Sequence, residues 1–432
     1  MFDAAFDRRQ FLGATALAGA TALAGAMALS PGWAWARTTD AKWTGVQALL
    51  DGYVAEDKMP GAAAAIGRGT AQADFLFAGK VGRGRDRLVD ADTLYRVYSM
   101  TKPITAMAAM MLIEDGKLGL DQDVGDFIPG FKKPMVIVDQ MVSLDAKPAT
   151  RPVTVRGLMT HSSGLGYIIT SKGKLLEAYA KLGLTGGLLS KADIPGFPKL
   201  TPAPTLAEFG DRIASLPLMY EPGTKWSYSA GLDVLGRVIE VASGMPFEKF
   251  LQTRIFDPLG MTSSFFHVPV SELPRLVTNY GVANGQQFPI DGGADSVYTD
   301  TATLPLGGGG LVMSPRDYDR FLLMLAGRGA IGSTRLMKPT TVALAMSNLL
   351  PPAVMTSGTF ADGQGFGAGG RVVINPKPGG AGMGTYGWGG AAATVAFVDP
   401  TKGIRGSGFA QFMPSEAIPF TTDFSKSVYA GL

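Results

Sequence analysis

Two serines in this chain are followed three residues later by a lysine, as Ser99–Lys102 and Ser171–Lys174. The chain has 432 residues, no Cys and two His. These counts exclude thiol catalysis and Cys-ligated metals, and they nearly exclude a His-rich metal site. A Ser-His-Asp triad is poorly supported, because no G-x-S-x-G elbow is present. What remains is a serine activated by a nearby lysine.

The surroundings of the two serines differ. Ser99 begins an apolar segment that predicts a helix, and Lys102 falls on the same helical face. The positive end of the helix dipole and its free N–H groups favour an anion at that point. Ser171 lies in a polar stretch whose lysines are expected to be solvated. Ser99 and Lys102 are therefore the candidate pair, although a capping serine followed by a surface lysine would give the same residues.

Neither histidine is a strong candidate for a general base. His161 lies at a predicted helix end, where a hydrogen-bonded structural residue is expected. His267 is expected in the core or at the surface. Two Gly-x-Gly-x-x-Gly patterns, beginning at Gly365 and Gly382, do not join a strand to a helix, so we expect turns there and no nucleotide site.

Several ordered segments accompany Ser99 and Lys102. They are Ser99–Pro103, Ile113–Leu118, Leu120–Val124, Leu158–Leu165, Glu221–Ser229, Pro258–Thr262, Gly307–Val312 and Asp317–Tyr318. Together they resemble the serine β-lactamase and penicillin-binding-protein superfamily. Within it the chain is class C β-lactamase-like and most similar to family VIII carboxylesterases. The likeness covers nearly the whole chain after residue 36, so it is far more specific than a Ser-x-x-Lys pattern alone.

The resemblance implies a fold and a site. The fold would be α/β (α+β), an antiparallel sheet flanked by helices with an inserted mostly helical domain, β-lactamase/transpeptidase-like. Tyr228 would join Ser99 and Lys102 in proton transfer. The backbone N–H groups of Ser99 and Ala391 would form the oxyanion hole. The substrate-binding edge would consist of Trp388, Gly389, Gly390 and Ala391. No metal or organic cofactor is implied.

Two positions depart from the β-lactamase motifs. The Tyr-x-Asn motif appears as Tyr228-Ser229-Ala230, so the amide that would bind a substrate's side chain is missing. The place of the Lys-Thr-Gly motif is taken by Trp388 and two glycines, so no cation is there to bind a β-lactam carboxylate. Such a charge-assisted contact contributes about 1.5–3 kcal/mol to recognition. Both departures favour an esterase over a β-lactamase, and the apolar ring of Trp388 suits an uncharged carboxylic ester, cleaved through an acyl-enzyme on Ser99.

Three alternatives to an esterase remain open. The first is a β-lactamase or D-Ala-D-Ala carboxypeptidase, against which Ala230 and Trp388 speak. The second is an acyltransferase or amide hydrolase of the same superfamily, which would share the residues Ser99, Lys102 and Tyr228. The third is a non-catalytic binding protein that has kept the fold.

Helices and strands that must position these residues follow from the apolar periodicity. Helices are expected at 41–57, 99–115, 206–215, 229–243 and 414–429. Strands are expected at 62–67, 74–81, 371–374, 391–398 and 404–412. Residues 130–205 are expected to form loops or a lid. This order predicts one hydrolase domain over 37–432, with an α/β part at about 37–98 and 265–432 and a helical part at about 99–264.

Residues 1–36 have the features of an export signal. Arg8 and Arg9 precede an apolar run, and Ala34-Trp35-Ala36 fits a small-x-small cleavage site. The pattern indicates a twin-arginine-type signal peptide and a periplasmic mature protein. A membrane anchor formed by an uncleaved N-terminus is the alternative. After cleavage no stable membrane anchor is expected, because no second long apolar run exists.

The overall charge limits the possible partners. The chain has 39 Lys+Arg and 36 Asp+Glu, a formal net charge of +3, so nucleic-acid binding by bulk charge is not expected. The expected partner is a small-molecule ester. The sequence leaves open the oligomeric state, the natural substrate, and whether Lys102 or Tyr228 is the general base.

Overall fold

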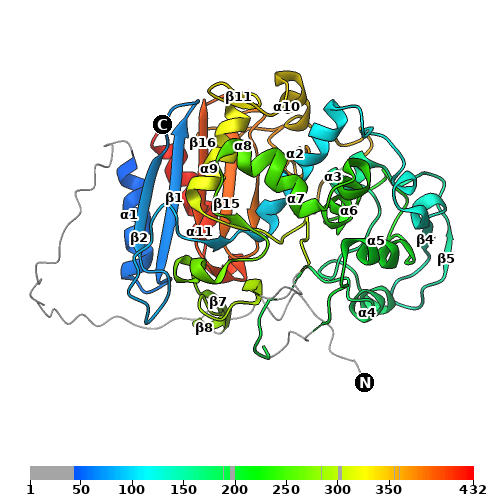
Figure 1. Ribbon diagram of the computed structural model, residues 1–432, viewed down its shortest axis with the longest axis horizontal. Helices are drawn as coiled ribbons and strands as arrows, with labels where there is room; N and C mark the ends of the chain where they lie inside the picture. Colours follow the sequence, from blue (N-terminus) through cyan, green and yellow to red (C-terminus); the bar gives the residue numbers. More distant parts are fainter. Residues whose placement is uncertain are drawn as a thin grey trace, which may run out of the picture. The chain divides into compact units, whose positions relative to one another are not determined.

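The largest sheet of the described structure has seven antiparallel strands and lies in the left half of the view in Figure 1. Its strands, in spatial order, are β12 (Gly365–Phe366), β13 (Arg371–Val372), β14 (Tyr386–Gly390), β15 (Thr394–Asp399), β16 (Ile404–Phe409), β1 (Gly61–Arg68) and β2 (Asp74–Gly79). The computed structural model describes residues 43–187, 189–194, 200–283, 285–299, 304–354, 356–359 and 361–432. The expected signal peptide at 1–36 lies outside these residues.

The middle of the sheet is buried on both faces, since every residue of β15 and β16 and those of β1 up to Gly67 are buried. In β1, Ala62 and Ala64 join the core formed with α1 (Thr44–Ala55) and α11 (Phe420–Ala430), whereas Ala63 faces the opposite core. This is the alternation expected of a strand. On the second face, α9 (Pro315–Ala326) packs on β1, β15 and β16, and α2 (Thr101–Glu114) reaches β14.

Helix α2 is enclosed by protein on all sides. Every residue from Thr101 to Leu112 is buried, and α6 (Gly231–Ser243), α7 (Phe247–Leu251) and α10 (Pro339–Ala345) pack against it. A helix rich in Ala, Met, Ile and Leu all round is suited to such a place. The threonine hydroxyls are paired, since Thr105 Oγ1 donates to the carbonyl oxygen of Gly307 at 2.8 Å. The helix that follows Ser99 is therefore fixed between β14 of the sheet and the helices α6, α7 and α10.

The remaining helices and strands belong to the helical part, to two small three-stranded sheets and to one further hairpin. The helical part also contains α3 (Val155–Thr160), α4 (Gly173–Lys181), α5 (Leu206–Ala214), the π-helical turn Gln252–Phe256, α8 (Asp257–Leu259) and the hairpin of β4 (Met135–Ile137) with β5 (Ala146–Pro148). Two three-stranded sheets are formed by β3 (Tyr95–Arg96), β9 (Val312–Met313) and β6 (Ser264–Phe265), and by β17 (Phe412–Met413), β7 (Asn279–Ala283) and β8 (Gln286–Asp291). A further hairpin joins β10 (Ala330–Ile331) to β11 (Thr334–Arg335).

The predicted fold class is confirmed, but several local predictions were wrong. Residues 130–205, expected to form loops, contain α3, α4 and the β4–β5 hairpin. The strand expected at 391–398 begins at Thr394, and β14 before it was not predicted. The composition Tyr-Gly-Trp-Gly-Gly is typical of a turn. Here it forms a strand because a Cβ at Gly387 would lie 2.1 Å from the carbonyl oxygen of Ala396, so close strand pairing requires glycine.

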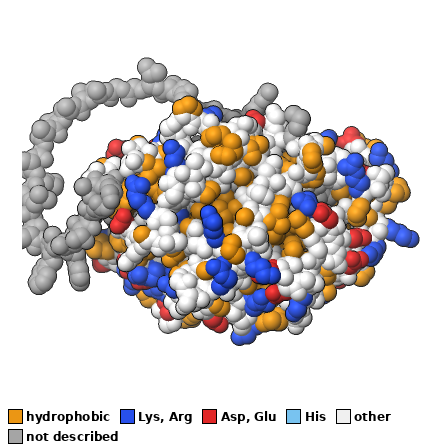
Figure 2. All heavy atoms as spheres, turned by 90° about the horizontal axis from the view of Figure 1, so that it is seen from above, with side chains coloured by type: hydrophobic (Ala, Val, Ile, Leu, Met, Phe, Trp, Pro, Cys, Tyr) orange, Lys and Arg blue, Asp and Glu red, His pale blue; other side chains and the backbone are white. Residues whose placement is uncertain are grey.

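On the face seen in Figure 2, basic side chains are scattered among acidic, apolar and uncharged ones and do not form one broad basic surface. Within the described ranges, no helix combines the length and apolarity that crossing a bilayer demands.

Candidate active site

Ser99 lies on the 3₁₀ turn Tyr98–Met100 that leads into α2. Tyr98 has a φ of 42°, an uncommon left-handed conformation for a residue other than glycine. Its buried side chain is held at the hydroxyl, which accepts a hydrogen bond from Asn279 Nδ2 at 3.0 Å. The backbone N–H of Val97 donates to the carbonyl oxygen of Leu311 at 3.1 Å. The strained residue before the candidate nucleophile is thus fixed from both sides.

Two polar side chains lie within hydrogen-bond distance of the Ser99 hydroxyl. Lys102 Nζ lies 3.1 Å from Ser99 Oγ, and Tyr228 Oη lies 2.6 Å from the same oxygen. Lys102 Nζ also lies 4.6 Å from the centre of the Tyr228 ring. Lys102 is completely buried and Tyr228 is 6% exposed. The structure therefore brings together the three residues that the sequence singled out.

A buried carboxyl supports the backbone that binds Lys102. Lys102 Nζ donates to the carbonyl oxygen of Gly308 at 2.5 Å, and the N–H of Gly308 donates to Asp233 Oδ1 at 2.6 Å. A Cβ at Gly308 would lie 2.5 Å from that oxygen, so the contact requires glycine. Burial raises the pKa of Asp233 to about 6, against the opposing effect of the Lys102 ammonium. Asp233 Oδ2 is buried without a hydrogen-bond partner among the described residues.

Trp388 covers the phenol. It lies on β14, and its ring stacks on that of Tyr228 with centroids 5.8 Å apart. Trp388 Nε1 donates to Tyr228 Oη at 3.4 Å. The strand also approaches the chain before Ser99, because a Cβ at Gly390 would lie 2.4 Å from the carbonyl oxygen of Val97. Gly389 and Gly390 end β14, and the exposed Ala391 begins the turn into β15.

His161 is held by hydrogen bonds and is not in contact with Ser99. Its Nδ1 accepts from the N–H of Ser229 at 3.2 Å and lies 3.0 Å from Ser229 Oγ. Its ring lies 4.6 Å from that of Tyr228. Burial, and then the Lys102 ammonium, lower the pKa of His161 well below its ordinary value. A neutral imidazole therefore fixes the segment that carries Tyr228, as expected for a structural histidine.

The second Ser-x-x-Lys pattern does not form a comparable site. Ser171 Oγ accepts from the N–H of Tyr167 at 3.2 Å, and the exposed Lys174 pairs with Glu177 at 3.0 Å. The lysine is thus engaged with a carboxylate on the surface of α4 and does not contact Ser171.

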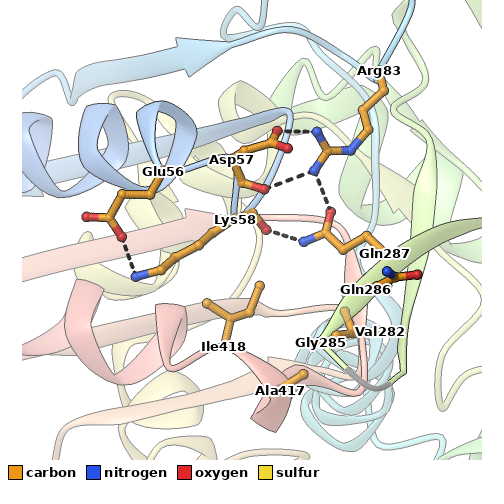
Figure 3. Close-up of a pocket in the computed structure, with 10 residues that line it drawn as sticks. All are labelled: Glu56, Asp57, Lys58, Arg83, Val282, Gly285, Gln286, Gln287, Ala417 and Ile418. Atoms are coloured by element: carbon orange, nitrogen blue, oxygen red, sulfur yellow. Dashed lines mark hydrogen bonds and ion pairs between the residues drawn. The ribbon is translucent and has the colours of Figure 1, made fainter. Parts of the chain in front are cut away.

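A polar cavity of about 560 Å³ lies elsewhere, between the end of α1 and the β7–β8 hairpin (Figure 3). Its charged residues pair with one another: Arg83 with Asp57, and Lys58 with Glu56 at 2.6 Å. No site residue named above lines this cavity. Among the described residues, no group of three or more His, Asp or Glu could hold a metal ion.

Two contributors to the site were missed by sequence reasoning. Asp233 reads as an ordinary acidic residue in the first turn of a helix, and Gly308 reads as one of four glycines in a loop. The spacing Tyr228-x₄-Asp233 could have placed the carboxyl near the site, but no local signal gives its hydrogen bond to Gly308.

Comparisons with known proteins agree with this geometry. Residues 46–420 match the Beta-lactamase family. The chain is 31% identical to Esterase EstB of Burkholderia gladioli over 381 residues, which are 83% of this chain and 88% of that protein. It is 31% identical to Lovastatin esterase of Penicillium rubens over 345 residues, 74% of this chain and 79% of that protein.

Among solved structures, the chain matches "EstCE1, a hydrolase with promiscuous acyltransferase activity", with a TM-score of 0.73 and 24% identity. The match covers 90% of this chain and 98% of that one, which shows a shared fold. The resemblance to serine β-lactamases, penicillin-binding proteins and family VIII esterases is thereby confirmed, and the chain belongs to the Beta-lactamase family.

Proposed function

We propose that this protein is a serine esterase that cleaves carboxylic esters through an acyl-enzyme on Ser99. The observation that carries the proposal is the pair of contacts to Ser99 Oγ, 3.1 Å from Lys102 Nζ and 2.6 Å from Tyr228 Oη. A serine hydroxyl is a weak nucleophile unless an adjacent group removes its proton. The two relatives named as esterases support the choice of reaction.

The acylation step follows from these contacts. Ser99 Oγ forms a bond to the ester carbonyl carbon while its proton passes to whichever of the two neighbours is in its basic form, Lys102 as the neutral amine or Tyr228 as the phenolate. The tetrahedral intermediate then expels the alcohol, which takes up that proton. We assign the oxyanion to the backbone N–H groups of Ser99 and Ala391. In the second half-reaction, water attacks the acyl carbon, the same groups move its proton to Ser99 Oγ, and the carboxylic acid leaves.

Two residues support an ester over a β-lactam. Trp388 occupies the place of the cation in the β-lactamase motif, and it covers the Tyr228 ring. Ala230 is buried and offers no side-chain amide to a substrate. Both features remove polar groups that a β-lactam antibiotic would use.

The test compares Ser99→Ala with Ser171→Ala, the matched change in the other Ser-x-x-Lys pattern. Both purified variants are assayed on short-chain para-nitrophenyl esters and on a chromogenic cephalosporin. The proposal expects Ser99→Ala to abolish ester turnover, Ser171→Ala to retain it, and the cephalosporin to be a poor substrate. Ester turnover that survives Ser99→Ala would refute the mechanism, and efficient cephalosporin cleavage would favour a β-lactamase instead.

We also propose export through residues 1–36, with the mature chain beginning near residue 37. The support is the sequence pattern of paired arginines, apolar run and cleavage site. Replacing Arg8 and Arg9 by Lys should retain the protein in the cytoplasm, as measured by cell fractionation.

A further inference from the structure

A positively charged side chain, that of Arg371, lies beside the candidate active site, on the strand next to β14. Arg371 of β13 pairs with Gly387 of β14, and its guanidinium carbon lies 5.9 Å from the centre of the Trp388 ring. Trp388 in turn stacks on Tyr228, whose hydroxyl contacts Ser99. The guanidinium is thus separated from the phenol by a single aromatic side chain.

Among the described residues, Arg371 has no partner for its charge. Within the described ranges it makes no hydrogen bond or ion pair, although its side chain is exposed. An accessible guanidinium without a carboxylate partner is free to bind an anion from solution.

Two other arginines of this chain differ from Arg371 in the partners or in the position of the guanidinium. The guanidinium of Arg83 lines the cavity of Figure 3, but Asp57 and Gln287 occupy its donors. Arg68 also stacks on a tryptophan, with its guanidinium carbon 5.4 Å from the Trp43 ring, but it lies at the end of β1 and Trp43 belongs to the core of α1 and α11. Arg371 combines donors that no described residue occupies with a place against the Trp388 ring, which stacks on Tyr228.

We propose that Arg371 forms an anion subsite and that the preferred substrates are esters that also carry a carboxylate. This inference rests on the proposed esterase function. A guanidinium presents a planar fork of N–H donors that matches both oxygens of a carboxylate. The subsite replaces, from the neighbouring strand, the cation that position 388 lacks. The expectation of an uncharged ester, drawn from Trp388 alone, is thereby changed.

The carboxylate could belong to the acyl part or to the alcohol part of the ester. Three substrates separate these cases: neutral para-nitrophenyl butyrate, para-nitrophenyl monoglutarate with the charge in the acyl part, and the butyryl ester of para-hydroxybenzoate with the charge in the alcohol part. The measured quantity is the ratio of kcat/KM for each charged ester to that for the neutral ester, in the wild type, Arg371→Ala, Arg371→Lys and the matched control Arg68→Ala.

We expect Arg371→Ala to lower this ratio about ten- to hundredfold for one of the charged esters, because a charge-assisted contact is lost. Arg371→Lys should lower it less, and Arg68→Ala should leave it unchanged. The ester with the larger loss identifies the part of the substrate that faces Arg371. A ratio that does not change in Arg371→Ala would overturn the proposal.

A binding measurement keeps the subsite testable without turnover. In isothermal titration calorimetry, glutarate should bind the wild type and Ser99→Ala more tightly than Arg371→Ala. Equal affinity in Arg371→Ala would overturn the subsite. Ester turnover that survives Ser99→Ala would instead overturn the proposed mechanism, and calorimetry would still decide on Arg371.

Discussion

Buried charged groups of the scaffold are paired with carboxylates, whereas those of the candidate active site are not paired in this way among the described residues. In the scaffold, Arg405 of β16 donates to Asp319 of α9 at 2.8 and 3.1 Å and to the carbonyl oxygens of Gly69 and Ala71. Arg96 of β3 is paired in the same way with Asp291, its Nε donating to Oδ2 at 2.6 Å. Both guanidinium groups are enclosed by acceptors.

In the site, by contrast, Lys102 contacts a hydroxyl and a carbonyl but no carboxylate among the described residues within ion-pair distance. Asp233 binds one backbone N–H and leaves Oδ2 unpartnered. Burying a charge is expensive unless it is fully paired. The scaffold pairs therefore hold elements together, whereas the site maintains charges that remain available to a reacting group. The predictions below test this distinction.

The largest expected effect comes from removing the phenol hydroxyl. Tyr228→Phe deletes the group 2.6 Å from Ser99 Oγ but keeps the ring that stacks on Trp388. Loss of general acid–base catalysis should lower kcat for ester hydrolysis by about 10²–10⁴-fold. Steady-state kinetics measure the loss. The melting temperature should remain near that of the wild type, and unchanged kinetics would remove Tyr228 from the mechanism.

Breaking an ion pair of the scaffold should lower stability and leave kcat nearly unchanged, the opposite of the effect expected for Tyr228→Phe. Asp319→Ala leaves Arg405 buried without its carboxylate and should lower the free energy of unfolding by about 3–5 kcal/mol, with little change in kcat of the folded protein. Urea denaturation measures the loss. The matched control is Asp92→Ala, which breaks the exposed pair with Arg316 and should change stability by less than about 1 kcal/mol.

Asp233 should couple stability to pH. The pKa of its carboxyl is about 6 in the folded protein and near 3.9 in an unfolded chain, so the folded state binds more protons between these values. Its contribution to stability is therefore lost as pH rises from about 4 to 6, by up to about 3 kcal/mol. In Asp233→Asn this part of the pH dependence should disappear from urea denaturation curves. An identical slope in both proteins would contradict the prediction.

A smaller effect is expected from the backbone that binds Lys102. In Gly308→Ala the new Cβ would meet Asp233 Oδ1 at 2.5 Å and displace the carbonyl that accepts from Lys102. Misplacement of a catalytic group by this route should lower kcat about ten- to hundredfold. Gly309→Ala is the matched control, because its nearest neighbour would lie 3.7 Å away. Equal kinetics in the two variants would show that the position of Gly308 does not matter.

The sequence predicts the site better where the residues are close along the chain. Ser99 and Lys102 share one helix start, and Tyr228 was found because it stands in an ordered segment of the resembling family. Arg371 could not be predicted, since it reaches Trp388 only through the pairing of two strands, one of which is too glycine-rich to read as a strand. Helix α4 was missed because short stretches with mixed polar residues carry little signal before Leu175 and Tyr179 are seen to be buried.

The enclosure of α2 links activity to the folding of the whole domain. Its amide hydrogens cannot exchange with solvent by loosening of the sheet or of the helical part alone, because the other still covers the helix. Hydrogen exchange in α2 should therefore be among the slowest in the protein. Since Ser99 stands at the start of this helix, heat inactivation and global unfolding should occur at the same temperature.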